Sequence, residues 1–305
     1  MTHNVDIAIV GSGFSGSLLA MIARRLGRSV VLIERGHHPR FAIGESSTPL
    51  ASLLLEEIAR QYDLPRLLPL GKYGSWRRAY PDVGCGLKRG FSFFRHEAGS
   101  PFAADVAHAN QLLVAASPRD DIGDVHWYRP DLDHFLVREA VALGATYLDG
   151  VELESFAVEA DGAHLEGIGL SVRARLVVDA TGPRGFLHRQ LGLGERPLPG
   201  LPSTQTLFTH FTGVRRFADI VPGAFAGALP YAPDDAAVHH VFDGGWTWVL
   251  RFDNGITSAG IAATEPLARE LRLHEGAAAW DRLLARFPSI GAQFADARPT
   301  REFTF

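Results

Sequence analysis

The sequence predicts an α/β protein in which a Rossmann-like β-α-β unit precedes an antiparallel sheet. The first observation is an apolar strand over residues 6–10 that ends in a glycine-rich turn over 11–16. An apolar helix over 17–26 and a second strand over 29–33 follow, which completes the β-α-β pattern. The second observation is the stretch 204–262, where strand-like runs alternate with turns rich in Gly, Pro and Asp.

The turn carries the spacing Gly11-x-Gly13-x-x-Gly16, which is typical of a dinucleotide-phosphate site. Gly11 permits the tight turn, Gly13 lets the backbone approach a pyrophosphate, and Gly16 lets the helix pack on the strand. The N–H groups at the helix N-terminus attract the anion. Glu34 lies 23 residues after Gly11, where an acid accepts hydrogen bonds from ribose hydroxyls. The predicted cofactor contacts here are Gly11, Gly13, Phe14, Ser15, Gly16, Glu34 and Arg35. The alternative is a structural glycine turn in another kind of α/β protein.

The remaining elements follow from apolar spacing and turn residues. Helices are expected over 50–60, from the residues after Trp127 through 143, and over 266–286. Strands are expected over 86–94, 144–148, 174–178, 206–212, 238–242, 247–252 and 257–261, with a hairpin at Asp161-Gly162. Asp131 and Asp133 are expected to cap the second helix. The stretches 62–82 and 95–125 are expected to be loop-like or irregular.

Composition and charge exclude several classes of partner. The chain has 305 residues, of which 46% are hydrophobic, a formal net charge of −4 and a pI of about 6.3. This balance favours neither nucleic acid nor an anionic membrane. No apolar run approaches the roughly 20 residues of a membrane span. The first strand leaves no room for a signal peptide, so we expect a cytoplasmic protein.

Neither cysteine nor histidine predicts a metal site. Cys85 is the single cysteine, which excludes an internal disulfide and a cysteine-rich site. The pairs His37-His38 and His239-His240 are adjacent, and adjacent residues on a strand face opposite ways. We expect no metal.

The two lysines stand out because the other 28 of the 30 basic residues are arginines. A bias in coding would explain this composition. A lysine also shifts its pKa and carries proton-transfer or nucleophilic chemistry more readily than an arginine. Lys72 and Lys88 are therefore candidate functional residues.

Three separated motifs agree with one another: the glycine turn with Glu34, the segment Trp127 to Asp133, and Val177-Val-Asp-Ala-Thr-Gly182. Together they resemble the FAD-dependent monooxygenase superfamily of the p-hydroxybenzoate hydroxylase type. The resemblance implies an FAD-binding domain over 1–200, with 62–125 partly on the substrate side, and an antiparallel-sheet substrate domain over 201–305. It further implies that Asp179 and Gly182 close over the cofactor phosphates and that Arg129 sits near the flavin.

Two further motifs, Gly44-Glu-Ser-x-x-Pro49 and Gly245-Trp-x-Trp248, look like the flavin-dependent halogenase branch. The second departs from the branch, because Leu250-Arg251 stands where the family has Ile-Pro. The resemblance implies that Ser46 approaches the flavin and that Trp246 and Trp248 shape a substrate pocket. The alternatives are a plain turn for Ser46 and aromatic packing beneath a sheet for the tryptophans.

Halogenases of this type carry a lysine between flavin and substrate that holds or activates hypohalous acid. Lys88 matches the setting of that lysine better than Lys72, because it lies in a strand-like context. It is the predicted catalytic residue. The alternative for Lys88 is a surface lysine that covers apolar side chains with its stem.

The resemblance therefore implies an FAD-dependent oxidoreductase that halogenates an aromatic or otherwise activated carbon of a small molecule. It would use O₂ and FADH2 supplied by a separate flavin reductase. The alternatives are a flavin monooxygenase that hydroxylates, and a flavin-dependent reductase or cyclase of the same fold. A truncated, non-catalytic flavoprotein is a further alternative, because the family's later Gly-Asp segment does not occur before Phe305.

Overall fold

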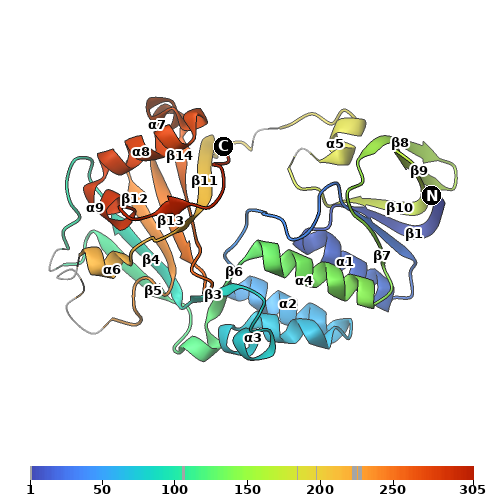
Figure 1. Ribbon diagram of the computed structural model, residues 1–305, viewed down its shortest axis with the longest axis horizontal. Helices are drawn as coiled ribbons and strands as arrows, with labels where there is room; N and C mark the ends of the chain where they lie inside the picture. Colours follow the sequence, from blue (N-terminus) through green and yellow to red (C-terminus); the bar gives the residue numbers. More distant parts are fainter. Residues whose placement is uncertain (1, 105–106, 184, 197, 222–224, 226–228) are drawn as a thin grey trace. The chain divides into compact units, whose positions relative to one another are not determined.

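The computed structural model describes residues 2–104, 107–183, 185–196, 198–221, 225 and 229–305 (Figure 1). The chain forms two compact units between which it passes several times. The first unit comprises Met1–Gly44, Glu56–Leu68 and Tyr128–Leu198, and the second Glu45–Leu55, Pro69–Trp127 and Pro199–Phe305. The assignment of a cofactor-binding role to residues 1–200 and a substrate-binding role to residues 201–305 stays a prediction.

The helices are short to medium in length. The α-helices are α1 (Phe14–Arg25), α2 (Pro49–Gln61), α3 (Tyr73–Ala79), α4 (Arg129–Ala142), α5 (Phe186–Gln190), α6 (Phe217–Ile220), α7 (Glu265–Leu271), α8 (Ala277–Arg286) and α9 (Pro288–Gln293). The 3₁₀ helices are η1 (Pro65–Gly71), η2 (Asp120–Ile122) and η4 (Leu273–Glu275). No helix in the described parts of the chain is both long and apolar enough to cross a bilayer.

The first unit contains a six-stranded sheet with the order β7-β2-β1-β10-β9-β8. Its strands are β1 (Thr2–Val10), β2 (Val30–Ile33), β7 (Thr146–Leu148), β8 (Leu153–Glu159), β9 (Gly162–Gly167) and β10 (Leu170–Asp179). The first four strands in that order pair in parallel, whereas β10, β9 and β8 pair antiparallel. Every residue of β2 is buried, as expected of a parallel strand covered on both faces. Helices α1 and α4 lie side by side against this sheet (Figure 1).

The second unit contains a seven-stranded sheet with the order β15-β11-β14-β13-β12-β4-β5. Its strands are β4 (Gly90–Arg95), β5 (Gln111–Ala115), β11 (Thr204–Thr212), β12 (Ala237–Phe242), β13 (Gly245–Arg251), β14 (Thr257–Thr264) and β15 (Arg298–Pro299). All neighbours pair antiparallel except β12 and β4, which are parallel. A separate two-stranded sheet joins β3 (Cys85–Lys88) to β6 (Asp124–Trp127).

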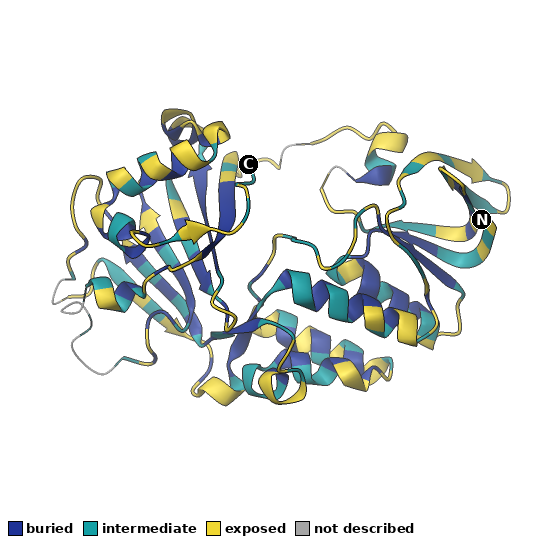
Figure 2. Cartoon of the chain, viewed as in Figure 1, coloured by how far each residue is buried: buried dark blue, intermediate teal, exposed yellow. Residues whose placement is uncertain are grey.

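One face of the seven-stranded sheet forms the core of the second unit. Helices α7, α8 and α9 cover it, and their inward residues are buried (Figures 1 and 2). The core contains the sheet residues Leu207, Phe211, Val238, Phe242, Val249, Ala259 and Ile261 and the helix residues Leu267, Trp280, Leu283 and Ile290. The strands alternate between this core and the opposite face because successive side chains on a strand point to opposite sides.

The opposite face carries a row of aromatic side chains across five strands. The strand register places Phe93 of β4 beside His239 of β12, which pairs with Trp248 of β13. Trp248 in turn pairs with Gly260 of β14, and Gly260 with Phe208 of β11. The Phe93 and His239 rings stack with centroids 4.8 Å apart, and Phe208 and Trp248 lie 6.1 Å apart. We call the four aromatic residues Phe93, His239, Trp248 and Phe208 the aromatic row; Gly260 lies between the last two.

Four predictions are corrected by the structure. One concerns the stretch 95–125, expected to be irregular, which contains β5 and η2. The strand expected over 86–94 is two strands in different sheets, β3 and β4, because the chain changes sheets at Arg89. The helix expected over 266–286 is broken into α7 and α8, with Arg272 and Gly276 at positive φ between them. The stretch 62–82, expected to be loop-like, contains η1 and α3. Apolar spacing does not detect such short helices, which are only two turns long.

Gly260 is expected to be required for the aromatic row. A Cβ at this position would lie 2.5 Å from Phe208 Cβ and from Trp248 Cζ2, so Gly260→Ala overpacks the face. We predict a loss of about 1–3 kcal/mol in the free energy of unfolding, measured by urea denaturation. Gly194→Ala is the control, because its Cβ would meet no atom within 4 Å. Equal stability of both variants would contradict the close packing of Trp248 on Gly260.

Candidate functional site

The glycine turn of the first unit is fixed by close backbone contacts. Gly11 has a φ of +101°, and a Cβ there would lie 2.5 Å from the Ala180 carbonyl oxygen. A Cβ at Gly16 would lie 1.9 Å from the carbonyl oxygen of Gly11. Only glycine fits at either position, because these neighbours are backbone atoms. The turn therefore brings the start of α1 against the ends of β1 and β10, where Ala180 N–H donates to the Val10 carbonyl at 2.7 Å.

Gly13 differs from the other two glycines because a Cβ there would make only ordinary van der Waals contacts, all with side chains. The nearest atoms to a Cβ there are guanidinium nitrogens of Arg40 at 3.6 Å and Arg129 at 3.7 Å. Gly182 has a φ of +87°, and a Cβ there would meet no atom within 4 Å. The backbone thus carries no side chain at Gly13 and Gly182. Beside Gly13 lie two guanidinium groups and the carboxylate of Asp133, whose Oδ2 is 3.8 Å from the position of a Cβ at Gly13. This arrangement fits an anionic pyrophosphate.

Glu34 organises the turn from the end of β2. Its Oε2 accepts hydrogen bonds from Ser12 N–H (3.1 Å), Ser12 Oγ (2.9 Å) and Arg40 (3.0 Å), and its Oε1 accepts one from Gly36 N–H (3.0 Å). Burial by itself raises the pKa of Glu34, but the hydrogen bonds from Gly36 and Ser12 and the charge of Arg40 outweigh burial and lower the pKa to about 2. The carboxylate is therefore ionised at neutral pH. Its contact with ribose stays a prediction.

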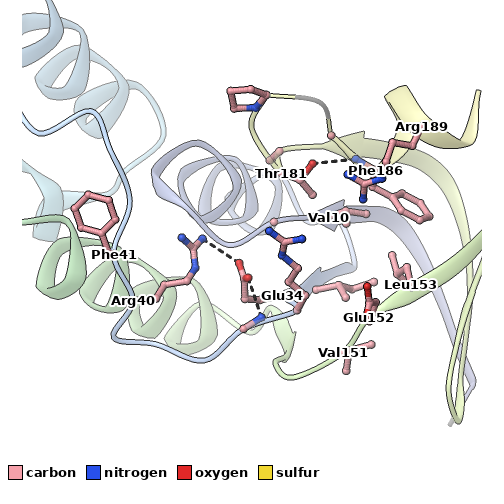
Figure 3. A pocket seen from close by; sticks show the side chains of 17 residues that line it. Val10, Glu34, Arg40, Phe41, Val151, Glu152, Leu153, Thr181, Phe186 and Arg189 are labelled. Carbon is pink, nitrogen blue, oxygen red and sulfur yellow. Dashed lines mark hydrogen bonds and ion pairs between the residues drawn. The ribbon is translucent and has the colours of Figure 1, made fainter. Parts of the chain in front are cut away.

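A cavity of about 310 Å³ lies beside the turn, entirely within the first unit (Figure 3). Its lining includes Gly11, Glu34, Arg35, Arg40, Val151, Thr181, Phe186 and Arg189. The volume lies at the lower end of the roughly 300–1,000 Å³ that is common for small-molecule sites. Because Glu34 and the turn border it, the cavity fits the nucleoside side of a dinucleotide.

Arg129 and Asp133 form a buried bidentate ion pair at the start of α4. Arg129 Nε and Nη2 donate to the two carboxylate oxygens at 2.7 and 2.8 Å, and Nη1 donates to the carbonyls of Ile43 and Gly44 at 2.8 and 3.2 Å. The prediction that Asp133 caps the helix is therefore wrong: its oxygens accept hydrogen bonds from a side chain one turn back on the helix. The arginine is held beside Gly13, and its proximity to a flavin stays a prediction.

Asp179 also acts on the backbone around it. Its carboxylate accepts hydrogen bonds from Thr181 N–H at 3.0 Å and from Leu187 N–H at 2.7 Å, so it ties the turn after β10 to α5. The structure thus places Asp179 and Gly182 on one side of the glycine turn, through the contacts of Ala180. Direct contact of either residue with a cofactor stays a prediction, as it does for Phe14 and Ser15.

Lys88, the predicted catalytic residue, is buried in the second unit. The residue is 1% exposed, which overturns the surface-lysine alternative. Nζ donates to the Ser47 carbonyl and lies 4.0 Å from the centroid of the Phe91 ring. Burial lowers the pKa of Lys88 to about 8, and the nearby Asp124 carboxylate opposes this shift. Lys72, by contrast, has a side chain that is 33% exposed and an Nζ 3.9 Å from Asp124 Oδ1.

The segment around Ser46 lies in the same unit. The Ser46 hydroxyl is buried and has no hydrogen-bond partner among the described residues, so it is suited to an external acceptor or donor. The adjacent Glu45 accepts from His210 Nε2 in a buried pair at 2.7 Å. The sequence pointed to Glu45 through its motif, but it contained no signal for His210 or Asp124. Both come from strands far along the chain.

The two tryptophans lie on the same face of β13, as their spacing predicts. Trp248 belongs to the aromatic row, and its Nε1 donates to Ser258 Oγ at 3.3 Å; Trp246 is 39% exposed. Leu250 is buried, and Arg251 donates to the carbonyls of Val214 and Arg215. The role of the tryptophans in a substrate pocket stays a prediction.

Cys85 is a buried, free cysteine, and burial raises the pKa of its thiol to about 12. A protonated thiol of this kind is unreactive at neutral pH. Across the described residues there is no group of three or more His, Cys, Asp or Glu side chains that could hold a metal ion.

Comparisons with known proteins identify the family of this chain. Residues 6–304 match the family model described as FAD dependent oxidoreductase. The chain is 32% identical over 308 residues to monodechloroaminopyrrolnitrin halogenase PrnC of Pseudomonas fluorescens, covering 99% of the chain and 53% of that protein. It is 32% identical over 313 residues to tetracycline 7-halogenase of Kitasatospora aureofaciens, covering 98% of the chain and 54% of that protein.

Among solved structures, halogenase PltM in complex with phloroglucinol and FAD superposes with a TM-score of 0.86 at 27% identity, covering 98% of the chain and 59% of PltM. The chain spans about half the length of the curated relatives that it matches. These matches confirm the predicted fold class, with its Rossmann-like FAD-binding part, and the resemblance to flavin-dependent halogenases.

Gly13 offers a test of the cofactor turn that leaves the fold intact. The Cβ of Gly13→Ala would make only ordinary contacts of 3.6 Å or more with protein atoms, but it would occupy the approach of the pyrophosphate. We predict that FAD affinity falls at least about tenfold, or about 1.4 kcal/mol, in a fluorescence titration. Gly194→Ala serves as the control. Unchanged affinity in Gly13→Ala would mean that the pyrophosphate does not pass this residue.

Glu34 gives a pH-dependent prediction. Its pKa is lowered from 4.5 to about 2 in the folded chain, so its stabilising effect is complete above pH 4.5 and disappears as the pH falls toward 2. We predict that wild type exceeds Glu34→Gln by about 2 kcal/mol in unfolding free energy from pH 5 to 8. The gap narrows between pH 4.5 and 3. Urea titrations at each pH measure this gap, and a constant gap down to pH 3 would contradict the prediction.

Proposed function

Because the chain belongs to the family of FAD-dependent oxidoreductases, we propose that it halogenates an aromatic or otherwise activated carbon of a small molecule. The observation that carries this proposal is Lys88, a buried ammonium that lies 4.0 Å from the centre of the Phe91 ring. Two curated relatives named as halogenases support it. The activity requires FADH2 from a separate flavin reductase.

The cofactor residues fit FAD. Its pyrophosphate would lie against the bare backbone at Gly13 and Gly182, beside the guanidinium groups of Arg40 and Arg129. Its adenosine part would occupy the cavity beside Glu34. Bound FAD in its reduced form, together with O₂, supplies the two-electron oxidation of halide to hypohalous acid. The protein supplies position, water exclusion and the charged groups described below.

Lys88 would hold the hypohalous acid and lend it a proton. One N–H of Nζ donates to the Ser47 carbonyl, so the others remain for the oxygen of the acid. The substrate carbon attacks the halogen, the oxygen–halogen bond breaks, and the oxygen leaves as water with a proton from Nζ. The carbon then loses its own proton, which restores the aromatic ring and recharges the amine. A pKa of about 8 keeps Nζ mostly protonated at pH 7 and still able to donate.

The aromatic row would position a flat substrate. Phe93, Trp248 and Phe208 are aromatic surfaces on the face opposite the core, and offset stacking on such rings is worth about 0.5–1.5 kcal/mol beyond the area buried. Trp246, more exposed, would lie at the edge of this surface. The row contains no carboxylate that would pair with a cationic substrate.

The first experiment asks whether the chain holds its cofactor. After excess FAD and desalting, a visible spectrum with flavin bands is the expected result. The protein is then incubated with a flavin reductase, NADH, O₂ and bromide or chloride, with phenols and pyrroles as substrates. Mass spectrometry is expected to show halogenated product. Hydroxylated product would instead support a monooxygenase, and loss of the flavin would support a non-catalytic flavoprotein.

Lys88→Ala tests the catalytic lysine. We predict at least about a hundredfold loss of halogenated product, because a positioned acid contributes roughly 10²–10⁴ in rate. FAD affinity is expected to stay at the wild-type level, since every cofactor residue described above belongs to the first unit except Ser46. Lys72→Arg keeps its charge and serves as the control. Halogenation by Lys88→Ala at the wild-type rate would show that the assigned role is wrong.

A further inference from the structure

Both lysines of the chain lie beside one buried carboxylate, that of Asp124. Asp124 is 1% exposed and pairs with Lys88 across the β3–β6 ladder. Its Oδ1 lies 3.9 Å from Lys72 Nζ, at the N-terminus of α3. The other 28 basic residues are arginines. The position of both lysines beside the same aspartate therefore indicates that this part of the fold favours amines over guanidinium groups.

We propose that Asp124 is a positioning residue that keeps the Lys88 ammonium charged and oriented, and that Lys72 keeps Asp124 ionised in turn. The use of Lys88 in halogenation rests on the proposed function. The coupling between Asp124 and Lys88 is a property of the chain itself, so it can be tested without cofactor or substrate.

The contacts around Lys88 leave it little freedom. Ser47, which accepts from Nζ, is tied to β6 beside Asp124: its N–H donates to the Val125 carbonyl at 3.1 Å, and its Oγ accepts from Val125 N–H at 3.2 Å. The Phe91 ring lies on another side of Nζ. The carbonyl and the ring thus define where the ammonium sits, and Asp124 lies directly opposite Lys88 in the strand pairing.

Asp124 is the negative charge that faces Lys88. The other titratable groups near it are His126 on β6 and His239 on β12. Burial lowers the pKa of His126 to about 3 and also lowers the pKa of His239, so both are neutral at pH 7. Burial likewise lowers the pKa of Lys88, and Asp124 opposes this shift. Without the carboxylate, a buried amine would lose its proton at a lower pH.

Lys72 has the complementary effect on Asp124. Burial raises the pKa of Asp124, while the charges of Lys72 and Lys88 and the hydroxyl of Ser52 lower it. An aspartate that took up a proton would no longer support Lys88. Lys72, whose side chain is partly exposed, therefore connects the buried Asp124 carboxylate to the protein surface.

Two lysines make a direct measurement simple. The cofactor-free chain, labelled with ¹³C-lysine, gives two Cε signals, and the loss of one in Lys72→Arg assigns both. In wild type, the Lys88 signal is expected to titrate near pH 8. In Asp124→Asn its pKa is expected to fall by about one unit or more, whereas in Asp124→Glu it stays close to the wild-type value. An unchanged Lys88 pKa in folded Asp124→Asn would overturn the proposal.

A second measurement needs no variant at residue 124. In wild type, protonation of Asp124 at acid pH should move the Lys88 Cε signal a second time, over the same pH range as the Asp124 Cγ signal. No second step while Asp124 Cγ titrates would also overturn the proposal, even if Asp124→Asn fails to fold. A change confined to the Lys72 signal would also overturn the proposal, because Asp124 would then only fix the start of α3.

The two proposals can fail separately. If the chain does not halogenate but the Lys88 pKa falls in Asp124→Asn, the proposed function fails and the coupling stands. If Lys88→Ala abolishes halogenation but the Lys88 pKa is indifferent to Asp124, the coupling fails. If both hold, the alkaline limb of the pH–activity profile moves down in Asp124→Asn by the same amount as the Lys88 pKa, which a structural role alone would not produce.

Discussion

The carboxylate of Glu34 collects hydrogen bonds from three places in the chain: the glycine turn at Ser12, the backbone at Gly36 and the guanidinium of Arg40. Burial opposes the ionised state, and these donors together outweigh burial. The dependence is mutual, because the same bonds hold the turn, shape the cavity wall and keep Arg40 beside Gly13. The ionised acid at the end of β2 therefore helps to fix the position of the backbone at Gly13, together with the close contacts of Gly11 and Gly16.

The second unit contains the opposite electrostatic situation. Glu34 has more donors than burial can offset, whereas Lys88 has a single carboxylate facing it and a lowered pKa. Burying an ammonium group costs free energy unless it is paired and hydrogen-bonded, so packing alone gives no reason for an amine at this place. A costly buried group that persists is characteristic of functional sites, where stability and activity compete. The same reasoning applies to the buried Ser46 hydroxyl, which has no partner in the described part of the chain.

Local patterns predicted what depends on local chemistry. The β-α-β unit, the strands of the second sheet and the shared face of Trp246 and Trp248 follow from periodicity and spacing. Asp133 was misjudged because helix capping is a local rule, and its actual partner, Arg129, is four residues back on the same buried helix face. Asp124 and His210 could not be found at all. Strand pairing brings Asp124 opposite Lys88, and a side-chain hydrogen bond joins His210 to Glu45, which is 165 residues away in the sequence. The break between β3 and β4 was missed because the residues on both sides of Arg89 have the same strand-like pattern.

That break has an evolutionary consequence. Only Arg89 separates the end of β3 from the start of β4, so Lys88 and the Phe91 ring are covalent near-neighbours although they belong to different sheets. Their separation is set by the length of this connection and not by the packing of distant strands. Changes in Phe208 or Trp248 could alter the surface offered to a substrate while the lysine and its ring remain in place. An insertion or deletion between residues 88 and 91 would change that separation directly, so lineages of this protein should tolerate substitution in the aromatic row far better than a change of length here.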